Sequence, residues 1–166
     1  MNAGYAFSFV RDAAEELRWG SVPAAGSQFR SRDLFPEAAG DIVGGSSRAL
    51  AGEIDPSVIP DVPTDRVAYV DGYGNLKTTA EHSALGISSG TVLGVRIGEV
   101  EHEATASDGG FEVEEGKLAF ASGSSGWVRP GGKKLRWMEL FLRGGSAWEA
   151  FGRPEVGARL EITPNP

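Results

Sequence analysis

The sequence contains no cysteine among its 166 residues, which excludes disulfide bonds and thiolate metal sites and is typical of a reducing compartment. Long apolar runs are also missing, and no stretch approaches the ~20 residues that a helix needs to cross a bilayer. Residues 1–10 lack the basic and apolar regions of a signal peptide. We therefore expect a cytoplasmic protein with no membrane partner.

Positive charge is scarce as well. Lys and Arg together number 16 against 23 Asp and Glu, which gives a formal net charge of −7. General nucleic-acid binders neutralise phosphates with clustered Lys and Arg, so we expect no nucleic-acid partner. The acids Glu99, Glu101 and Glu103 alternate along one predicted strand, which indicates a solvated face. No ligands stand at metal-like spacing, so we expect no metal site.

Glycine and proline are abundant, with 24 and 9 residues, and this composition favours short strands joined by turns. Apolar residues alternate with polar ones in the second part of the chain, as expected for strands with one buried face. This pattern predicts a mainly β fold, an antiparallel β barrel or sandwich of about seven strands. The predicted strands are residues 67–71, 76–79, 91–97, 99–106, 117–122, 135–142 and 158–163.

The first part of the chain predicts two helices instead. Apolar residues fall at helical spacing over residues 7–19. A second helix is expected to begin at Ser31 or Asp33 and to end before Gly44, with Pro36 in its first turn. We therefore divide the chain into residues 1–45 and residues 46–166.

Residues 67–79 carry the candidate chemistry, in a predicted strand, tight turn and strand. Asp71, Tyr73 and Asn75 lie within five residues, separated by Gly72 and Gly74, which permit positive φ and close approach of a ligand. Two interpretations are open for this turn. Its polar residues either form an ordinary hairpin turn or converge on a ligand.

Several stretches together resemble the S-adenosylmethionine hydroxide adenosyltransferase family, which includes the fluorinase and chlorinase enzymes. Asp-Gly-Tyr-Gly-Asn-Leu at residues 71–76, followed by threonines, is similar to that family's signature. Phe-Arg-Ser-Arg-Asp-Leu-Phe-Pro-Glu at residues 29–37 resembles a segment at the end of its N-terminal domain. The remaining similar elements are Ser124-Ser125-Gly126, Glu139-Leu140, Gly145-Ser146-Ala147 and residues 156–162.

The resemblance implies a fold of two parts, an N-terminal α/β domain and a C-terminal antiparallel β domain. Residues 1–45 would then be the remnant of a truncated α/β domain with linker helices, and residues 46–166 the β domain. Family members are usually trimers, with substrate between the two domains of neighbouring subunits. The expected partners are therefore a homotrimer or a missing N-terminal domain.

The resemblance also implies a site for S-adenosylmethionine, which is a substrate, so no cofactor is expected. Asp71 would face the methionine or ribose end, Tyr73 would offer an aromatic face, and Asn75 would bind the adenine edge. The other implied contacts are Ser124 and Ser125 at the amino-acid end and Ser146 and Ala147 near adenine. The family often has an aromatic residue where this chain has Ala106, so the ring would have to come from Phe111 or Phe120.

Two positions bear on catalysis. Arg30 stands at the position of a family histidine, and a guanidinium stays protonated near neutral pH and cannot act as a general base. Ser31 stands where the fluorinase uses a serine to hold halide, but a serine there is also an ordinary helix cap, which is the interpretation that we prefer. The resemblance thus implies no firm catalytic residue.

The expected function is nucleoside binding in a reaction of S-adenosylmethionine with water or halide, which yields adenosine or halo-adenosine plus methionine. We expect no turnover by this chain alone. The alternative is a non-catalytic adenosine-binding or trimerisation module.

Overall fold

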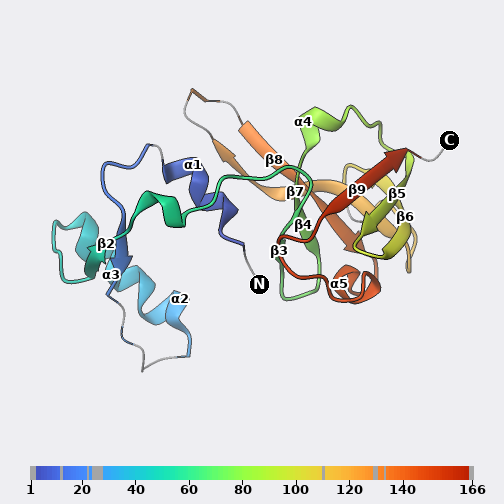
Figure 1. Cartoon of the computed structure of the whole chain (residues 1–166). Helices are drawn as coiled ribbons and strands as arrows, with labels where there is room; N and C mark the ends of the chain where they lie inside the picture. Colours follow the sequence, from blue (N-terminus) through green and yellow to red (C-terminus); the bar gives the residue numbers. More distant parts are fainter. Residues whose placement is uncertain are drawn as a thin grey trace. The chain divides into compact units, whose positions relative to one another are not determined.

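The computed structural model describes residues 3–11, 13–21, 23, 28–109, 111–128, 131–132 and 134–164. The chain forms two compact units (Figure 1). One is Val10–Ile59, and the other combines Met1–Phe9 with Pro60–Pro166. The expected division of the chain into residues 1–45 and residues 46–166 stays a prediction.

The larger unit is built on a seven-stranded sheet in the order β3-β4-β8-β7-β6-β5-β9. All seven strands expected from apolar alternation are present, which confirms the mainly β fold. In β5, for example, Leu93, Val95 and Ile97 are buried while Arg96 is exposed. The strands are β3 (Val67–Val70), β4 (Leu76–Glu81), β5 (Val92–Ile97), β6 (Val100–Ser107), β7 (Leu118–Val128), β8 (Lys134–Leu142) and β9 (Leu160–Pro164).

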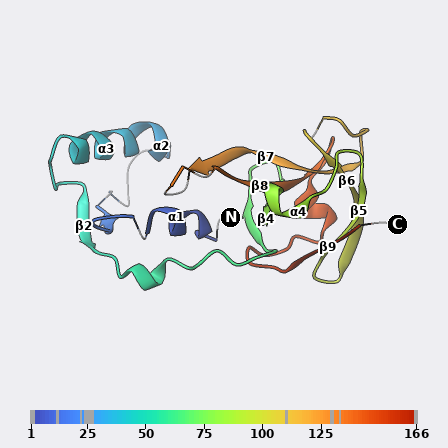
Figure 2. The ribbon, with the colours of Figure 1, turned by 90° about the horizontal axis from the view of Figure 1, so that it is seen from above.

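One strand pair departs from the expected antiparallel arrangement. β6 and β7 run parallel, with Ala104 beside Leu118 and Ser107 beside Ala121. Residues 108–117 connect them, and a parallel pair requires such a crossover instead of a tight hairpin. The sheet is therefore mixed, and Figure 2 shows its curl.

The curl brings the first strand toward the last. The backbone N–H of Val67 donates to the carbonyl of Ala158 at 3.0 Å, and that of Leu160 donates to Asp65 at 2.9 Å. Arg66 and Arg159 form an antiparallel bridge between them. The curved sheet encloses the main core, to which α5 (Ala147–Ala150) contributes. Its fully buried large side chains are Phe120, Leu76, Leu93, Leu140, Leu160, Val67 and Val95.

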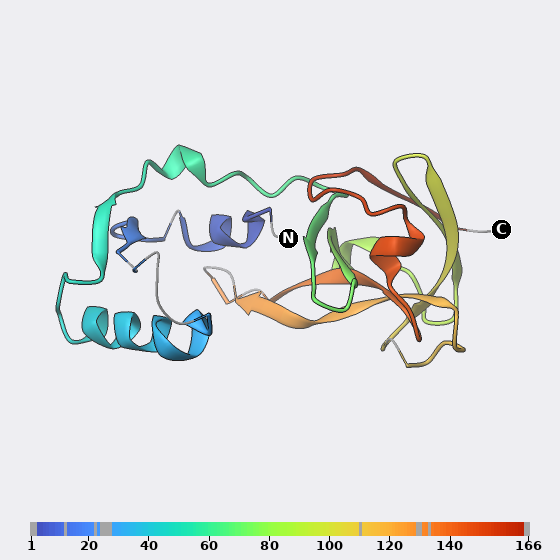
Figure 3. The same cartoon turned by 90° about the horizontal axis from the view of Figure 1, so that it is seen from below.

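β7 and β8 form a long antiparallel hairpin, visible in Figure 3 as two adjacent strands. Trp127 of β7 and Trp137 of β8 lie on the two facing strands of this hairpin. Its Trp127 and Trp137 rings lie 4.7 Å apart, and Phe9 packs 5.4 and 5.5 Å from them. These rings thus form part of a second hydrophobic cluster.

The N-terminal helix expected over residues 7–19 is wrong in extent. The chain forms a 3₁₀ turn, η1 (Tyr5–Phe7), then α1 (Ser8–Arg11), and then enters β1 (Arg18–Gly20), which pairs with β2 (Leu50–Glu53). A helix of that length is marginal in water unless its apolar face packs along the whole helix. Phe9 joins the aromatic cluster, whereas Trp19 is drawn into the strand pair and stays exposed.

The second expected helix is present in two pieces, α2 (Arg30–Asp33) and α3 (Phe35–Val43). Pro36 lies in the first turn of α3, and the helix ends before Gly44, as predicted. Ser31 as the N-cap is wrong, because Phe29 occupies that position and Ser31 lies inside α2. The unit also holds the short helix η2 (Pro56–Val58). In the part of the chain that the structure describes, no helix is both long and apolar enough to span a bilayer.

Candidate functional site

The turn between β3 and β4 is organised by one carboxylate. Oδ1 of Asp71 accepts the backbone N–H of Tyr73 at 2.8 Å and that of Asn75 at 2.9 Å. Oδ2 accepts the side-chain amide of Asn75 at 2.9 Å. The Gly74 N–H donates to the Asp71 carbonyl at 3.2 Å, which closes the turn. Asp71 therefore fixes both the backbone of the turn and the side chain of Asn75.

These contacts change the acidity of Asp71. Partial burial alone raises the pKa of its carboxyl, because it disfavours the charged form. The hydrogen bonds from Asn75, Tyr73 and Gly74 favour the charged form, and together they outweigh burial. The net pKa of Asp71 is below its ordinary value, so the carboxylate is ionised at neutral pH.

Gly74 connects the turn to the segment around α5. Its φ is +81°, and its carbonyl accepts the backbone N–H of Trp148 at 2.8 Å. A Cβ on Gly74 would lie 2.9 Å from Cβ of Ser146, closer than real contacts allow. Ser146 in turn caps α5, since its hydroxyl oxygen accepts the N–H of Glu149 at 3.2 Å. The turn and the start of α5 are therefore held together at a position that only glycine fits.

Two open hollows adjoin this turn. The first has a volume of about 460 Å³ and is lined by Asp71, Tyr73, Ser146, Trp148 and Glu149, among others. Tyr73 stands at its edge with 85% of its surface exposed. Residues 71, 73 and 146, which the sequence proposed separately, thus share one hollow.

The second hollow has a volume of about 440 Å³ and is lined by Asn75, Ser122, Gly123, Glu139 and Phe141, among others. Asn75 therefore faces a different hollow from Tyr73. Asp71 lines the first hollow and Asn75 lines the second, and a hydrogen bond joins their side chains.

Strand register explains how the second hollow forms. Leu76 of β4 lies beside Leu140 of β8, and both point into the main core. The neighbouring pair, Lys77 and Glu139, consequently points to the opposite face. Nζ of Lys77 and Oε2 of Glu139 are 3.5 Å apart, with 14% and 19% of their side chains exposed.

A glycine on β7 packs closely against this ion pair. A Cβ on Gly123 would lie 3.3 Å from both Cε of Lys77 and Oε2 of Glu139. Ala121, which lines the same hollow, lies beside Glu139 in the strand register. Position 123 therefore has no space for a side chain, because the ion pair and the Trp137 carbonyl already pack against it.

An aromatic wall comes from the connection between β6 and β7. Phe111 is 80% exposed and packs edge-on against Phe141, with ring centroids 5.7 Å apart. The Arg143 guanidinium donates to the carbonyls of Phe111 at 3.2 Å and Val113 at 2.7 Å, which holds this connection. Both phenylalanines line the second hollow.

The two rings named from the sequence as substitutes for a missing aromatic have different positions. Phe120 is fully buried in the main core beside Ala106, so its ring has no ligand-facing surface. Phe111 is exposed at the hollow that Asn75 also lines. Only Phe111 is placed to contact a ligand there.

The remaining sequence-proposed residues lie elsewhere. Ala147 is fully buried in the main core, so only its backbone could reach a ligand. Ser124 and Ser125 lie within β7, next to Gly123, and their side chains fall outside the described part of the structure. Arg30 and Ser31 are in α2, which belongs to the unit Val10–Ile59 and not to the unit that carries both hollows.

The sequence analysis did not single out Trp148 and Glu149, which line the first hollow, or Lys77, which pairs with Glu139. It noted Glu139 only as part of a motif. Lys77 could have been suspected from its place two residues after Asn75, because alternate residues of a strand share a face. The pairing of Lys77 with Glu139 could not be predicted from the sequence, because it depends on the register of β4 against β8. Trp148 is positioned by its Nε1–H, which donates to the Pro154 carbonyl at 3.0 Å.

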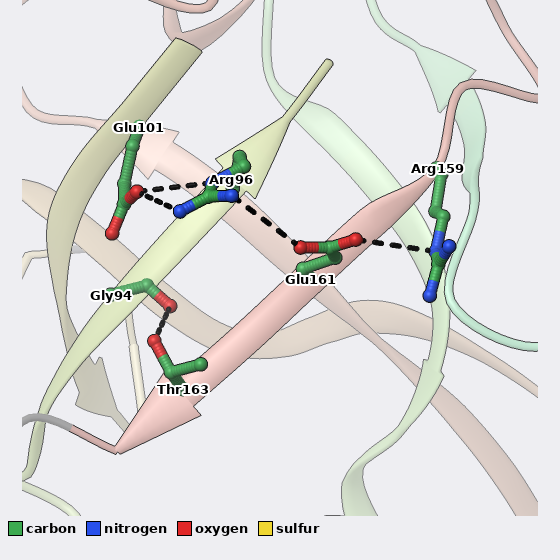
Figure 4. Close-up of polar contacts among 6 residues, drawn as sticks. All are labelled: Gly94, Arg96, Glu101, Arg159, Glu161 and Thr163. Carbon is green, nitrogen blue, oxygen red and sulfur yellow. Dashed lines mark hydrogen bonds and ion pairs between the residues drawn. The ribbon is translucent and has the colours of Figure 1, made fainter. Parts of the chain in front are cut away.

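The acidic stretch expected to be solvated lies on a different part of the sheet. Figure 4 shows Arg96 of β5 between Glu101 of β6 and Glu161 of β9, with Arg159 beyond. Arg96 and Glu101 approach to 2.7 Å, and both are about half exposed. Surface pairs of this kind contribute little to stability. Within the described residues, no group of three His, Asp or Glu side chains could hold a metal ion.

The comparisons with known proteins define the fold but no family. No family model and no curated protein matches the chain. Eighteen chains of solved structures do match. One is the crystal structure of an uncharacterized conserved protein from Thermotoga maritima, with a TM-score of 0.55 and 21% sequence identity. The match covers 84% of this chain and 54% of that one, so the chain spans about half the length of that protein. At this identity the likeness shows the fold alone.

Proposed function

We propose that the unit containing β3–β9 binds the nucleoside part of S-adenosylmethionine in the hollow lined by Asn75, Phe111 and Phe141. It would do so as the nucleoside-binding part of an adenosyltransferase that combines S-adenosylmethionine with water or halide. The observation that carries this proposal is the fixed Asn75 amide. Its Nδ2 donates to Asp71 at 2.9 Å, at the wall of a hollow that also contains exposed aromatic surface.

An amide suits the edge of a purine. Its NH₂ group has two donors and its oxygen is an acceptor, so one N–H bound to Asp71 leaves a donor and an acceptor for a ligand. Adenine offers the complementary pair, an amino group beside a ring nitrogen. Because Asp71 holds the amide in one orientation, little side-chain entropy is lost on binding.

The aromatic wall suits the faces of the same base. Stacking of a base on an aromatic side chain contributes about 1–3 kcal/mol and requires an exposed ring face. Phe111 is 80% exposed, and Arg143 holds the backbone that carries it. In this hollow the Asn75 amide would therefore bind the edge of the adenine base, and the Phe111 ring would stack on its face.

The proposal assigns binding to this chain and no catalytic residue. Activation of water would require a general base, and an arginine side chain does not serve as one. We therefore expect no turnover by the chain alone. The expectation of a homotrimer stays a prediction, which light scattering of the purified chain tests directly.

Isothermal titration calorimetry with adenosine and with S-adenosylmethionine tests the proposal. We expect both to bind, Asn75→Ala to abolish binding, and Phe111→Ala to weaken it by on the order of tenfold. Thr163→Ala, an exposed polar residue on β9, is the matched control and should bind as the native chain does.

Asn75→Ala also removes one hydrogen bond of the turn, so thermal unfolding must accompany the titration. Phe111→Ala leaves the turn intact and keeps the test decisive if the first variant unfolds. Native binding that survives both substitutions unchanged would show that the nucleoside lies elsewhere, and no binding by the native chain would end the proposal.

A further inference from the structure

The first hollow, beside the β3–β4 turn, is a different hollow from the one proposed for the nucleoside. It has a volume of about 460 Å³ and is lined by residues of the turn and of α5. These two elements lie side by side in Figures 1 and 3, and the Trp148 N–H donates to the Gly74 carbonyl at 2.8 Å. The volume falls within the range of about 300–1,000 Å³ that is typical of ligand pockets. The hollow is therefore large enough for a ligand of its own.

The charged side chains that line this hollow are all carboxylates. Among the described residues they are Asp71 and Glu149, and no lysine or arginine accompanies them in the lining. Asp71 is kept ionised by hydrogen bonds from N–H groups, with no neighbouring cation contributing in the part of the chain that the structure describes. Its negative charge is therefore not neutralised nearby. A hollow of this kind attracts a cationic ligand.

Two aromatic rings add to the lining. Tyr73 is 85% exposed at the edge of the hollow, and Trp148 lines it from α5. The face of a tyrosine or tryptophan ring attracts a cation, and in proteins that cation is more often arginine than lysine. A planar guanidinium can stack on the ring and still donate hydrogen bonds to a carboxylate. Rings and carboxylates together therefore suit a guanidinium group.

The chain itself already places one guanidinium in this way. The guanidinium carbon of Arg153 lies 5.4 Å from the centre of the Trp148 ring, and Nη2 of Arg153 is 3.0 Å from Oε1 of Glu149. The backbone of Arg153 has a φ of +62°, in the left-handed region that residues other than glycine rarely adopt. Such a conformation persists only where surrounding contacts hold it, and it is frequent at ligand sites. Arg153 thus shows how this ring and this carboxylate hold a guanidinium.

We propose that the first hollow binds an arginine side chain of a partner polypeptide. The guanidinium stacks on the Tyr73 ring and faces the two carboxylates, while Arg153 competes with it for Glu149. Exposed tyrosine and tryptophan side chains are typical of the energetically important contacts between proteins. An open hollow with such a ring at its edge accepts a side chain that projects from another surface. The site lies outside the nucleoside hollow and does not depend on that proposal.

Three blocked tripeptides test the site: acetyl-Gly-Arg-Gly-amide and its counterparts with lysine or citrulline in the middle. Citrulline has nearly the shape of arginine but carries no charge. NMR follows the indole Nε1–H of Trp148, which is held by its hydrogen bond to the Pro154 carbonyl. We expect the arginine peptide to shift this signal saturably, with a dissociation constant at least about fivefold below that of the citrulline peptide. The lysine peptide should bind less tightly than the arginine peptide.

Two variants test the proposed contacts. Tyr73→Ala should lower the preference for arginine over citrulline to about twofold or less, because a surface ion pair alone contributes little. Its matched control is Phe111→Ala, which removes a ring of similar exposure from the other hollow and should leave the preference unchanged. Arg153→Gln should tighten binding of the arginine peptide by about threefold or more, because it removes the competing guanidinium. Arg159→Gln changes the net charge equally at an exposed pair outside the hollow and should have no effect.

The opposite results would overturn the proposal. Equal affinity for the arginine and citrulline peptides would do so, and so would a preference that persists in Tyr73→Ala. Equal tightening by Arg153→Gln and Arg159→Gln would show an effect of net charge rather than of competition in the hollow. A lysine peptide that binds at least as tightly as the arginine peptide would contradict the assignment of a guanidinium. Adenosine binding is measured separately, so these results leave the nucleoside proposal untouched.

Discussion

The side-chain amide of Asn75 and the carboxylate of Asp71 are joined by a 2.9 Å hydrogen bond, and the same carboxylate accepts the Asn75 backbone N–H. Through these two contacts Asp71 holds both the backbone and the side chain of Asn75 in place. The two interpretations of the turn, as a hairpin former and as a ligand site, are therefore compatible. Asp71 performs the structural task, and Asn75 is presented to the hollow.

Replacing Asp71 with Asn should destabilise the chain. The substitution preserves the shape but removes the negative charge that several N–H groups share, and an uncharged acceptor makes weaker bonds. We expect the free energy of unfolding to fall by about 1–3 kcal/mol at pH 7, measured by urea denaturation followed by circular dichroism. Glu155→Gln, an exposed carboxylate, is the control and should change it by less than about 0.5 kcal/mol.

The free energy of unfolding of the native protein and that of Asp71→Asn should depend differently on pH. Because the pKa of Asp71 is lower in the folded chain, its contribution to stability is fully present above the unfolded-state pKa. That contribution is lost as the pH falls through the folded-state value. The difference between native protein and Asp71→Asn should thus be constant near neutral pH and shrink below about pH 4. A difference that grows on acidification would contradict the assignment.

Gly74→Ala should be far more damaging than Gly72→Ala. Gly74 has φ +81°, and its new Cβ would meet Ser146, whereas a Cβ on Gly72 meets no atom within 4 Å. We expect Gly74→Ala to lower the free energy of unfolding by at least about 2 kcal/mol, from backbone strain and the clash together. Gly72→Ala should stay within about 0.5 kcal/mol. Equal effects in thermal unfolding would mean that the turn and the start of α5 are not packed as described.

Arg143→Ala should loosen the connection between β6 and β7 without unfolding the sheet. Its guanidinium holds the carbonyls of Phe111 and Val113. Hydrogen exchange of the amides in residues 108–116 should accelerate by on the order of tenfold, equivalent to about 1.4 kcal/mol of local stability. Arg159→Ala, whose guanidinium contacts the exposed Glu161, serves as the control and should leave that exchange unchanged.

Much of the fold follows from local sequence because a strand with one buried face requires alternation. Leu93, Val95 and Ile97 are buried as that alternation predicts. The helix over residues 7–19 failed for the opposite reason. Its apolar residues have helical spacing, but their partners are distant in the chain. Phe9 packs against Trp127, and Trp19 lies in β1, which pairs with β2, so the segment does not continue as one helix.

The sequence by itself determined the seven strands, the tight turn after β3 and the absence of cross-links, because these depend on residue type and on spacing within a few residues. Only the tertiary structure decided that β6 and β7 run parallel, that Phe120 is core while Phe111 is exposed, and that Lys77 meets Glu139 beside Gly123. These relationships depend on the register between strands far apart in the chain. That register is set by how the whole sheet curls around its core, which no local pattern encodes.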